Sequence, residues 1–358
     1  MAPSAWVSMS KHSLNEVLLP SKFCDVGHNS KIAWSRGWVT IQPSLMIIKI
    51  SNQWNLLLAG VFVALLGFTQ ESKGDASEGA PKVTAPGAQL QQLGNGFKFT
   101  EGPSSDREGN VYFTDQPNDR IVRWDAKSGE LTDWLKPAGR SNGTFFDADG
   151  QLVTCADGRN ELWSIGPDKK ARVLVLEYDS KALNGPNDLW IRPDGGLYFT
   201  DPLYKRPYWE RDPSMQQDGQ HVYYLPKGSN RPIRVADGLK QPNGIIGTPD
   251  GKKLYVADIR AGKTWSYKIH QDGKLSDKTL FCEMGSDGMT IDSEGNIYLT
   301  GRGVTVFNSL GEQIQSIPVP VGWAANVTFG GTDGRLLFIT ASKAVFGIRM
   351  RTRGVSPF

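Results

Sequence analysis

Short apolar segments rich in aromatic and β-branched residues recur along most of the chain, and each follows a turn that ends in glycine. The segments read "VYFTD", "LVTCAD", "LYFTD", "LYVAD", "IYLTG" and "LLFITA". The preceding turns contain Asp-Gly or Glu-Gly, with their glycines at Gly109, Gly150, Gly195, Gly251, Gly295 and Gly334. An acidic residue followed by glycine between apolar runs is typical of β-hairpins, because glycine adopts the positive φ that tight turns require. The pattern therefore predicts six similar hairpins.

The spacing of these turns indicates how the hairpins are arranged. Successive turn glycines are 41, 45, 56, 44 and 39 residues apart. An interval of this length holds about four short strands, because strands average about 5–6 residues and hairpin loops about 2–5. Six four-stranded units of this period predict an all-β protein, a six-bladed β-propeller. The 40 glycines and 21 prolines of the 358-residue chain favour the same class, with many short strands and turns.

The two ends of the repeat region are predicted to meet. After the last repeat begins, apolar runs near 327–330, 335–340 and 344–349 give three strands, and the chain then ends. An unassigned apolar segment, "AQLQQLGNGFKF" at 88–99, precedes the first repeat. Pairing this N-terminal segment with the C-terminal strands would complete the sixth blade and remove an open sheet edge. We therefore expect residues 88–358 to form a single closed domain.

The N-terminal quarter differs from the repeat region. Residues 56–68, "LLLAGVFVALLGF", form an uncharged apolar run that follows a lysine and precedes a polar segment. This arrangement predicts a secretory signal over 46–70, with an uncleaved anchor as the alternative. Met46 is then the expected start, 1–45 an extension outside the native protein, and 71–87 a disordered linker. The mature protein is expected to be exported, periplasmic or extracellular, without stable membrane insertion.

A second regularity lies eight residues before each turn glycine. All six positions hold an acid or an amide, and they are Glu101, Asn142, Asn187, Asn243, Asp287 and Asn326. Each begins the strand that leads into a hairpin, so six blades would place them in one ring around the central axis. Asparagine before a strand is alone typical of a turn. A glutamate at the first position and a shared offset in all six repeats favour a site.

The ring has the chemistry of a site for a hard cation. Carboxylate and amide oxygens suit a divalent ion, calcium first, with Zn²⁺, Mn²⁺ or Mg²⁺ as alternatives. Glu101 and Asp287 are carboxylates, which can balance the charge. Such an ion can polarise a carbonyl or phosphoryl oxygen, and a neighbouring carboxylate can act as a general base. The net charge of +3 and the lack of a basic cluster argue against a nucleic-acid partner.

The longest interval between turn glycines carries a polar and aromatic insertion, "DPLYKRPYWERDPSMQQDGQ" at 201–220. If it covers one end of the channel, Asp201 and Tyr204 would lie near a substrate. A surface insertion without a role in the site is the alternative.

Several motifs together resemble those of the senescence marker protein/gluconolactonase/luciferin-regenerating enzyme family, and most of all its bacterial gluconolactonase-like branch. They are "TEGPSSDREGNVYFTD", "LNGPNDLWIRPDGGLYFTDPLY", "LKQPNGIIGTPDGKKLYVAD" and "GSDGMTIDSEGNIYLT", and the similarity extends over about residues 90–350. The resemblance implies a six-bladed propeller with one catalytic divalent cation that hydrolyses lactones.

The resemblance also implies roles for ring residues. Glu101, Asn243 and Asp287 match the metal ligands of the family, and Asp287 matches its general base. Asn187 matches a residue that contacts the substrate or the metal. We expect Asn142, Asp201 and Tyr204 to contact the substrate as well. In the animal members an arginine stands two residues before the channel asparagine, where this chain has Gly185.

The sequence leads to one main hypothesis and two alternatives. The main hypothesis is an exported, metal-dependent hydrolase of a small-molecule lactone, with Asp287 as general base. One alternative is hydrolysis of phosphotriesters or fluorophosphates at the same ring. The other is a non-enzymatic propeller that binds a ligand and in which the cation is structural. The sequence makes no prediction of the oligomeric state.

Overall fold

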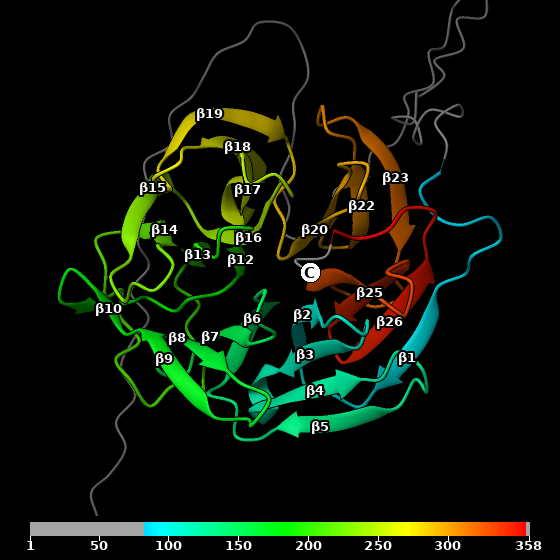
Figure 1. Cartoon of the computed structure of the whole chain (residues 1–358), viewed down its shortest axis with the longest axis horizontal. Coiled ribbons are helices and arrows are strands. Elements are labelled where there is room, and N and C mark those ends of the chain that lie inside the picture. The colour runs from blue at the N-terminus through cyan, green and yellow to red at the C-terminus, as the bar shows by residue number, and fades with distance from the viewer. Residues whose placement is uncertain (1–81, 356–358) are drawn as a thin grey trace, which may run out of the picture. The chain divides into compact units, whose positions relative to one another are not determined.

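Six antiparallel sheets of four strands each stand around a central axis (Figure 1). A computed structural model of the chain describes residues 82–355. Within this part of the chain the helical elements are two 3₁₀ turns, η1 (Gln116–Asn118) and η2 (Ile259–Ala261). The predicted all-β, six-bladed propeller is therefore confirmed.

The blades follow one another along the chain. Blade 1 has the strands β2 (Thr100–Ser105), β3 (Val111–Asp115), β4 (Arg120–Trp124) and β5 (Leu131–Leu135). Blade 2 has β6 (Ser141–Phe146), β7 (Leu152–Ala156), β8 (Glu161–Ile165) and β9 (Ala171–Val175). Blade 3 has β12 (Leu189–Ile191), β13 (Leu197–Asp201), β14 (Gln220–Leu225) and β15 (Ile233–Leu239).

The remaining blades complete the ring. Blade 4 has β16 (Pro242–Gly247), β17 (Lys253–Asp258), β18 (Lys263–Ile269) and β19 (Leu275–Cys282). Blade 5 has β20 (Met289–Ile291), β21 (Ile297–Thr300), β22 (Gly303–Phe307) and β23 (Gln313–Pro318). Blade 6 has β24 (Asn326–Gly330), β25 (Leu336–Ala341), β26 (Ala344–Arg349) and β1 (Gln91–Asn95). A two-stranded ribbon, β10 (Glu177–Tyr178) and β11 (Lys181–Ala182), lies outside the blades.

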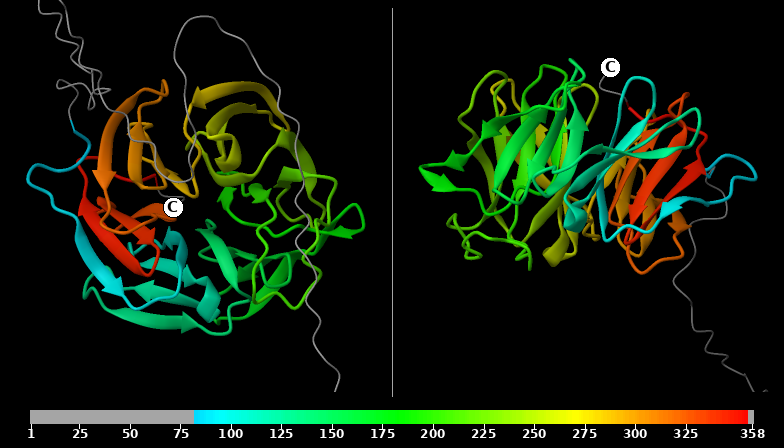
Figure 2. Two further views of the ribbon diagram at one scale, coloured as in Figure 1. Left: turned by 180° about the vertical axis from the view of Figure 1, so that it is seen from behind. Right: turned by 90° about the horizontal axis from the view of Figure 1, so that it is seen from below.

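The N-terminal strand closes the ring, as the sequence predicted. Strand β1 pairs antiparallel with β26, with Gln91 opposite Gly347 and Asn95 opposite Ala344. Figure 2 shows this cyan strand beside the red strands at the other end of the chain. Strand β1 thus covers the edge of β26, and this pairing of segments remote in sequence holds the two ends of the domain together.

The predicted start of the domain at residue 88 needs a correction. Val83 is buried among apolar side chains of blades 5 and 6, and Thr84 forms a β-bridge with Met350. The backbone N–H of Arg351 donates to the carbonyl of Val83 at 2.8 Å. Residues 82–87, which we predicted to belong to a disordered linker, are therefore part of the folded domain. Val83 stands in a segment of mostly small and polar residues, so the composition of that segment did not indicate its burial.

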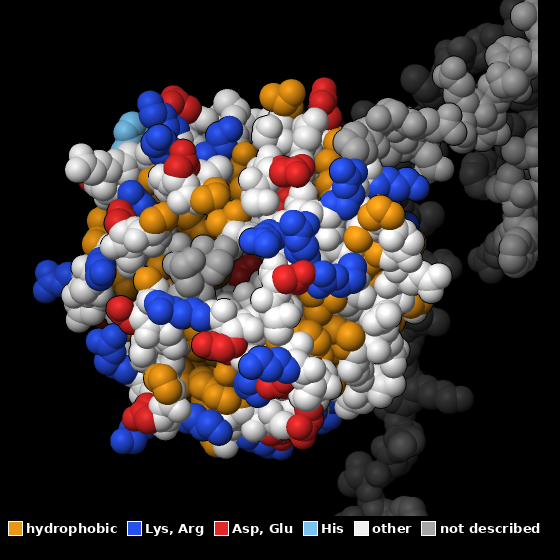
Figure 3. Space-filling model, turned by 45° about the vertical axis from the view of Figure 1, so that its right-hand side comes forward, with side chains coloured by type: hydrophobic (Ala, Val, Ile, Leu, Met, Phe, Trp, Pro, Cys, Tyr) orange, Lys and Arg blue, Asp and Glu red, His pale blue; other side chains and the backbone are white. Residues whose placement is uncertain are grey.

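The other predictions for the N-terminal region concern the extension at 1–45, the signal at 46–70 and the rest of the linker at 71–81. These segments lie outside the described residues. Within residues 82–355 no helix has the length and apolar character needed to cross a membrane. On the face drawn in Figure 3, basic and acidic side chains are interspersed rather than gathered into fields of one sign.

Apolar clusters join each blade to the next. Phe113 of blade 1 packs against Phe338 of blade 6, with ring centroids 5.6 Å apart, and Trp190 and Ile245 belong to a cluster shared by blades 3, 4 and 5. Further clusters connect blades 1 and 2, 2 and 3, and 5 and 6. The first strand of every blade contacts the first strands of both neighbouring blades. The six inner strands therefore form a fixed frame around the axis.

Loss of the closing strand is expected to destabilise the whole domain. A variant that begins at Phe97 lacks β1 and the contacts of Val83, so β26 becomes an open edge. Each lost backbone hydrogen bond costs about 1 kcal/mol, and the sum should be several kcal/mol. We expect a much lower midpoint of thermal unfolding, or insoluble protein, than for a variant that begins at Lys82. An unchanged cooperative transition in the shorter variant would contradict this role of β1.

Candidate active site

The six predicted ring residues lie at the start of the six inner strands. Glu101, Asn142, Asn243 and Asn326 are within β2, β6, β16 and β24, while Asn187 and Asp287 lie two residues before the first residues of β12 and β20. Five of the six are buried, and Asp287 is partly exposed. The common offset from the turn glycine therefore corresponds to a common position at one end of the central channel.

Glycines after the ring residues bring neighbouring blades close together. A Cβ at Gly102 would lie 2.0 Å from the carbonyl oxygen of Asn142, and one at Gly288 would lie 2.0 Å from the side chain of Asn326. Gly143 and Gly244 approach the ring residues of the following blades in the same way. The recurring acid-glycine and Asn-Gly pairs are thus explained by close packing around the axis, where a side chain would not fit.

Threonine hydroxyls fix the backbone of the ring. The hydroxyl of Thr114 in β3 donates to the carbonyl oxygen of Asn142 at 3.1 Å, and that of Thr200 in β13 donates to the carbonyl oxygen of Asn243 at 2.8 Å. Each bond runs from one blade to the ring residue of the next. The threonines of the repeated "FTD" segments therefore position the backbone of the ring.

Asp287 is held by two hydrogen bonds to its carboxylate. The side-chain N–H of Asn243 donates to Oδ1 at 2.7 Å, and the indole N–H of Trp323 donates to Oδ2 at 2.6 Å. Loss of solvation raises the pKa of Asp287, and these two hydrogen bonds together with the charge of Arg206 oppose the rise. Sequence reasoning missed Trp323, which lies in a loop outside the repeat motifs.

Glu101 is the second carboxylate of the ring. Its Oε2 accepts a hydrogen bond from the backbone N–H of Gly102 at 2.7 Å. Burial, and next the negative charge of Asp287, raise the pKa of Glu101 well above its usual value. The structure thus brings together two carboxylates whose charges repel each other in the channel.

Asp188 adds a third acid next to the ring, which the sequence analysis missed. It stands where four of the other five repeats have glycine, and its side chain is buried. Its Oδ1 accepts the backbone N–H of Leu189 at 3.0 Å, and its Oδ2 accepts the amide N–H of Asn326, from blade 6, at 3.4 Å. Burial raises the pKa of Asp188 to about 8. The departure from the Asn-Gly pattern at Asn187-Asp188 is the sequence feature that could have indicated a role for Asp188.

Three asparagines of the ring have side-chain atoms available to a ligand: two have a free amide oxygen, and the third has a free amide group. The Oδ1 atoms of Asn142 and Asn243 are buried and have no hydrogen-bond partner among residues 82–355. The side-chain amide of Asn187 makes no hydrogen bond within residues 82–355, although its backbone is held by Thr200 and Gly143 at 2.9 and 2.7 Å. Buried oxygens without partners are unfavourable, so these positions are suited to receive a cation or a substrate.

The donor set fits the divalent cation that the sequence resemblance implies. Glu101 and Asp287 supply two buried carboxylates whose mutual repulsion a cation would offset. Asn243 supplies an amide oxygen that has no hydrogen-bond partner among the described residues. These are hard oxygen donors of the kind that calcium prefers. No group of three His, Cys, Asp or Glu residues suited to a metal occurs between residues 82 and 355, so a thiolate- or imidazole-rich site is not built there.

The insertion between β13 and β14 reaches the ring. The hydroxyl of Tyr204 accepts the side-chain N–H of Asn243 at 2.8 Å, so Tyr204 lies beside the ring. Farther along the insertion, the indole N–H of Trp209 donates to Asp157 of blade 2 at 3.1 Å. The segment 202–219 therefore extends from blade 4 to blade 2 at this end of the channel, and it covers part of the site.

Asp201, which we predicted to contact the substrate, has a structural role instead. It is fully buried, and its carboxylate accepts the backbone N–H groups of Asn184 and Gly185 at 2.9 and 2.8 Å. Asp115 and Asp258 accept two backbone N–H groups each at the same place in blades 1 and 4. The aspartate that ends these strands therefore holds the segment before the inner strand. The recurrence of this aspartate in the "TD" and "AD" motifs is the sequence feature that could have indicated its structural role.

The Asp201→Asn variant is expected to lose stability rather than substrate affinity. The amide nitrogen would face one of the two backbone N–H groups, and the loss of that buried bond should cost about 1–3 kcal/mol. Thermal unfolding should begin several degrees lower, while KM of the folded variant stays within about twofold of the native value. A large rise in KM without loss of stability would restore Asp201 to the substrate site.

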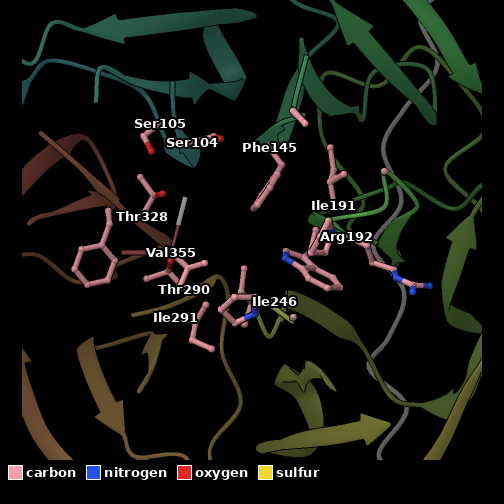
Figure 4. Close-up of a pocket in the computed structure, with 17 residues that line it drawn as sticks. Ser104, Ser105, Phe145, Ile191, Arg192, Ile246, Thr290, Ile291, Thr328 and Val355 are labelled. Atoms are coloured by element: carbon pink, nitrogen blue, oxygen red, sulfur yellow. The ribbon is translucent and has the colours of Figure 1, made fainter. Parts of the chain in front are cut away.

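The other end of the channel is a cavity of about 230 Å³. Phe145, Ile246, Thr290 and Thr328, from the inner strands of four blades, surround it in Figure 4, with Val355 beside them. It contains no acid among its lining residues and lies at the opposite ends of the strands that start with the ring residues. The polar end and this mainly apolar end are therefore chemically distinct.

The predicted site residues divide into three groups. The structure brings together Glu101, Asn243, Asp287 and Tyr204 through direct hydrogen bonds or neighbouring charges. Asn142 and Asn187 lie at equivalent ring positions with free amide groups. Asp201 lies in the supporting structure. The residues that sequence reasoning missed are Asp188, Trp323 and Arg206.

Comparisons with known proteins agree with this fold. A gluconolactonase of Zymomonas mobilis is 28% identical over 294 residues, which cover 74% of this chain and 82% of the relative. A solved gluconolactonase structure from Xanthomonas campestris has a TM-score of 0.69 at 31% identity and covers 75% of this chain and 91% of that one. A calcium-binding regucalcin of Agrobacterium tumefaciens, with a TM-score of 0.62, 18% identity and coverage of 74% and 95%, shares the fold.

The family model described as the SMP-30/gluconolactonase/LRE-like region matches residues 99–343. This match includes five complete blades and the first two strands of the sixth. The chain belongs to the SMP-30/gluconolactonase/LRE-like family.

Proposed function

We propose that the protein is a metal-assisted lactonase that hydrolyses the ester bond of a small lactone. The observation that carries the proposal is the ring, where Asp287 and Glu101 lie beside the unpartnered amide oxygen of Asn243. The relatives named gluconolactonase support lactone hydrolysis as the reaction. The partner is then a small molecule that enters the polar end of the channel.

Glu101, Asn243 and Asp287 would hold the cation, and Asn187 is placed to contact either the cation or the substrate. A divalent ion bound there supplies positive charge that offsets the two carboxylates and polarises the lactone carbonyl. Calcium suits this set of oxygen donors best, because it accepts carboxylates, amides and water in flexible geometry. Zn²⁺, Mn²⁺ and Mg²⁺ are the alternatives that a metal analysis has to distinguish.

Asp287 is the proposed general base. Its carboxylate takes a proton from the water whose oxygen bonds to the lactone carbonyl carbon. The ring carbon–oxygen bond then breaks, and the proton passes to the leaving alkoxide, which gives the open hydroxy acid. The indole N–H of Trp323 and the amide N–H of Asn243 hold the carboxylate in place for this transfer. Trp323 is therefore a positioning residue.

The neutral groups of the ring are proposed to orient the lactone. Asn142 and Asn187 offer side-chain amides that form no hydrogen bond with the described part of the chain, and hydroxyl groups of a sugar lactone are suitable partners for them. Tyr204 covers the site from the 202–219 segment and is fixed by Asn243. A covered, partly dehydrated site strengthens the interactions of its charged groups with the reacting ester.

We further propose that the mature protein is exported to the periplasm or the exterior. The apolar run at 56–68 and its flanking residues support this proposal.

A substrate panel tests the proposed function. The purified domain should hydrolyse aldono-1,4- and 1,5-lactones faster than the spontaneous background, and paraoxon or diisopropyl fluorophosphate much more slowly. Preference for the organophosphates would favour the phosphotriesterase alternative. Turnover of neither class, together with stabilisation by metal, would favour the non-enzymatic propeller.

A further inference from the structure

Two arginines, Arg206 and Arg211, lie beside Asp157 at the edge of the polar channel mouth, each with a nitrogen 3.6 Å from its carboxylate, and they differ in how their donors are used. Arg211 donates to the carbonyl of Asn184 at 2.9 Å. Arg206, in contrast, makes no hydrogen bond with any residue between 82 and 355, and its Nε is buried without a partner. Its guanidinium therefore has its hydrogen-bonding capacity unused.

Asp157 does not accept a hydrogen bond from the guanidinium of Arg206. The Nε of Arg206 lies 3.6 Å from Oδ2 of Asp157, which is too long for a hydrogen bond. That oxygen already accepts the indole N–H of Trp209 at 3.1 Å and the amide N–H of Gln116 at 3.2 Å. The carboxylate thus supplies one negative charge beside two guanidinium groups, and the donors of Arg206 are left for another acceptor.

The guanidinium of Arg206 lies close to the proposed reaction site. Its central carbon is 5.1 Å from the ring centroid of Tyr204, whose hydroxyl is bonded to Asn243. Its side chain is 23% exposed, which leaves it accessible to a ligand.

The packing of the insertion keeps this arginine at the mouth. A Cβ at Gly185 would lie 2.9 Å from Oδ1 of Asp157 and 3.2 Å from Nη2 of Arg211. The lack of a side chain at Gly185 therefore leaves space for the insertion to dock. Docking of Trp209 and Arg211 in turn positions the segment that contains Tyr204 and Arg206.

We propose that Arg206 binds a carboxylate carried by the substrate, and that the preferred substrate is the lactone of a dicarboxylic sugar acid. The proposal rests on the proposed lactonase function. A guanidinium with free donors pairs with a carboxylate through two parallel charge-assisted hydrogen bonds, which a neutral hydroxyl does not match. The ring ester of the lactone then lies at the ring of polar residues, and its free carboxylate lies at Arg206. Arg206 is thus a specificity-determining residue.

Steady-state kinetics on two lactones of the same ring size test the assignment. The native protein should have a kcat/KM for D-glucaro-1,4-lactone at least about tenfold above that for D-glucono-1,4-lactone. Arg206→Met should lower kcat/KM for the acidic lactone by roughly tenfold to a hundredfold, mainly through KM. The neutral lactone should change less than about threefold, and Arg206→Lys should recover part of the loss. Arg231→Met, at an exposed arginine in blade 3, is the matched control.

Equal losses on both lactones, or no preference in the native protein, would overturn the assignment. If neither lactone is hydrolysed, the proposed function has failed, and calorimetric binding of D-glucarate still tests Arg206. Tighter binding by the native protein than by Arg206→Met supports the carboxylate subsite. Equal affinities of the two proteins refute it.

Discussion

The Asp287→Asn variant is expected to hydrolyse an aldonolactone about 10²–10⁴ times more slowly than the native protein, because the proposed general base is lost. The amide cannot accept the proton of the attacking water. It also has an N–H group where the native carboxylate accepts hydrogen bonds from Trp323 and Asn243 at 2.6 and 2.7 Å. The loss should appear mainly in kcat, measured by continuous titration of the acid that hydrolysis releases.

The fold of Asp287→Asn should persist, since the variant removes one of two repelling carboxylates from the ring. Circular dichroism and the midpoint of thermal unfolding check this point. Asp237→Asn, at an exposed position in β15, is the matched control and should keep the native rate. Native activity in a folded Asp287→Asn protein would remove Asp287 from the mechanism.

Calcium is expected to raise the midpoint of thermal unfolding of the native protein and to have little effect on Glu101→Gln. A ligand at about 100 times its Kd stabilises a protein by about 2.7 kcal/mol. For a domain of this size that corresponds to roughly 5–10 °C. Glu101 supplies one of the two ring carboxylates, so its neutral replacement should reduce the shift to a small fraction. Differential scanning fluorimetry with calcium and with chelator measures both shifts.

The control for the calcium experiment is Glu130→Gln, at an exposed glutamate of blade 1. It should show the native calcium shift. An equal shift in Glu101→Gln would mean that calcium stabilises the protein from some other place. A native protein without any shift from calcium, zinc, manganese or magnesium would argue against the metal site.

The architecture was predictable because each blade carries the same two signals. The acidic residue and glycine of the hairpin fix the period, and the polar residue eight positions earlier fixes the register of the inner strand. Closure by β1 followed from counting strands in the last repeat. Val83 could not be predicted in the same way, because its burial depends on blades 5 and 6, which lie far away in sequence.

The ring was predictable from its register, while the supporting contacts were not. Trp323 reaches Asp287 from a loop of irregular sequence, and Arg206 reaches the mouth from an insertion without a repeat equivalent. Asp201 shows the opposite error, because a residue near the insertion was assigned to the substrate although its position recurs in other blades. Comparison of Asp201 with Asp115 and Asp258 separates the structural acids from the ring acids.

The most direct test of the account is the rate of D-glucono-1,5-lactone hydrolysis by one protein sample before chelation, after removal of metal, and after addition of calcium. Metal analysis of each sample and subtraction of spontaneous hydrolysis are part of the measurement. The account predicts that the rate falls to near background without metal and returns with calcium or another divalent ion. Full activity in protein shown to be free of metal, or no hydrolysis with any divalent ion, would contradict metal-assisted lactone hydrolysis at this ring.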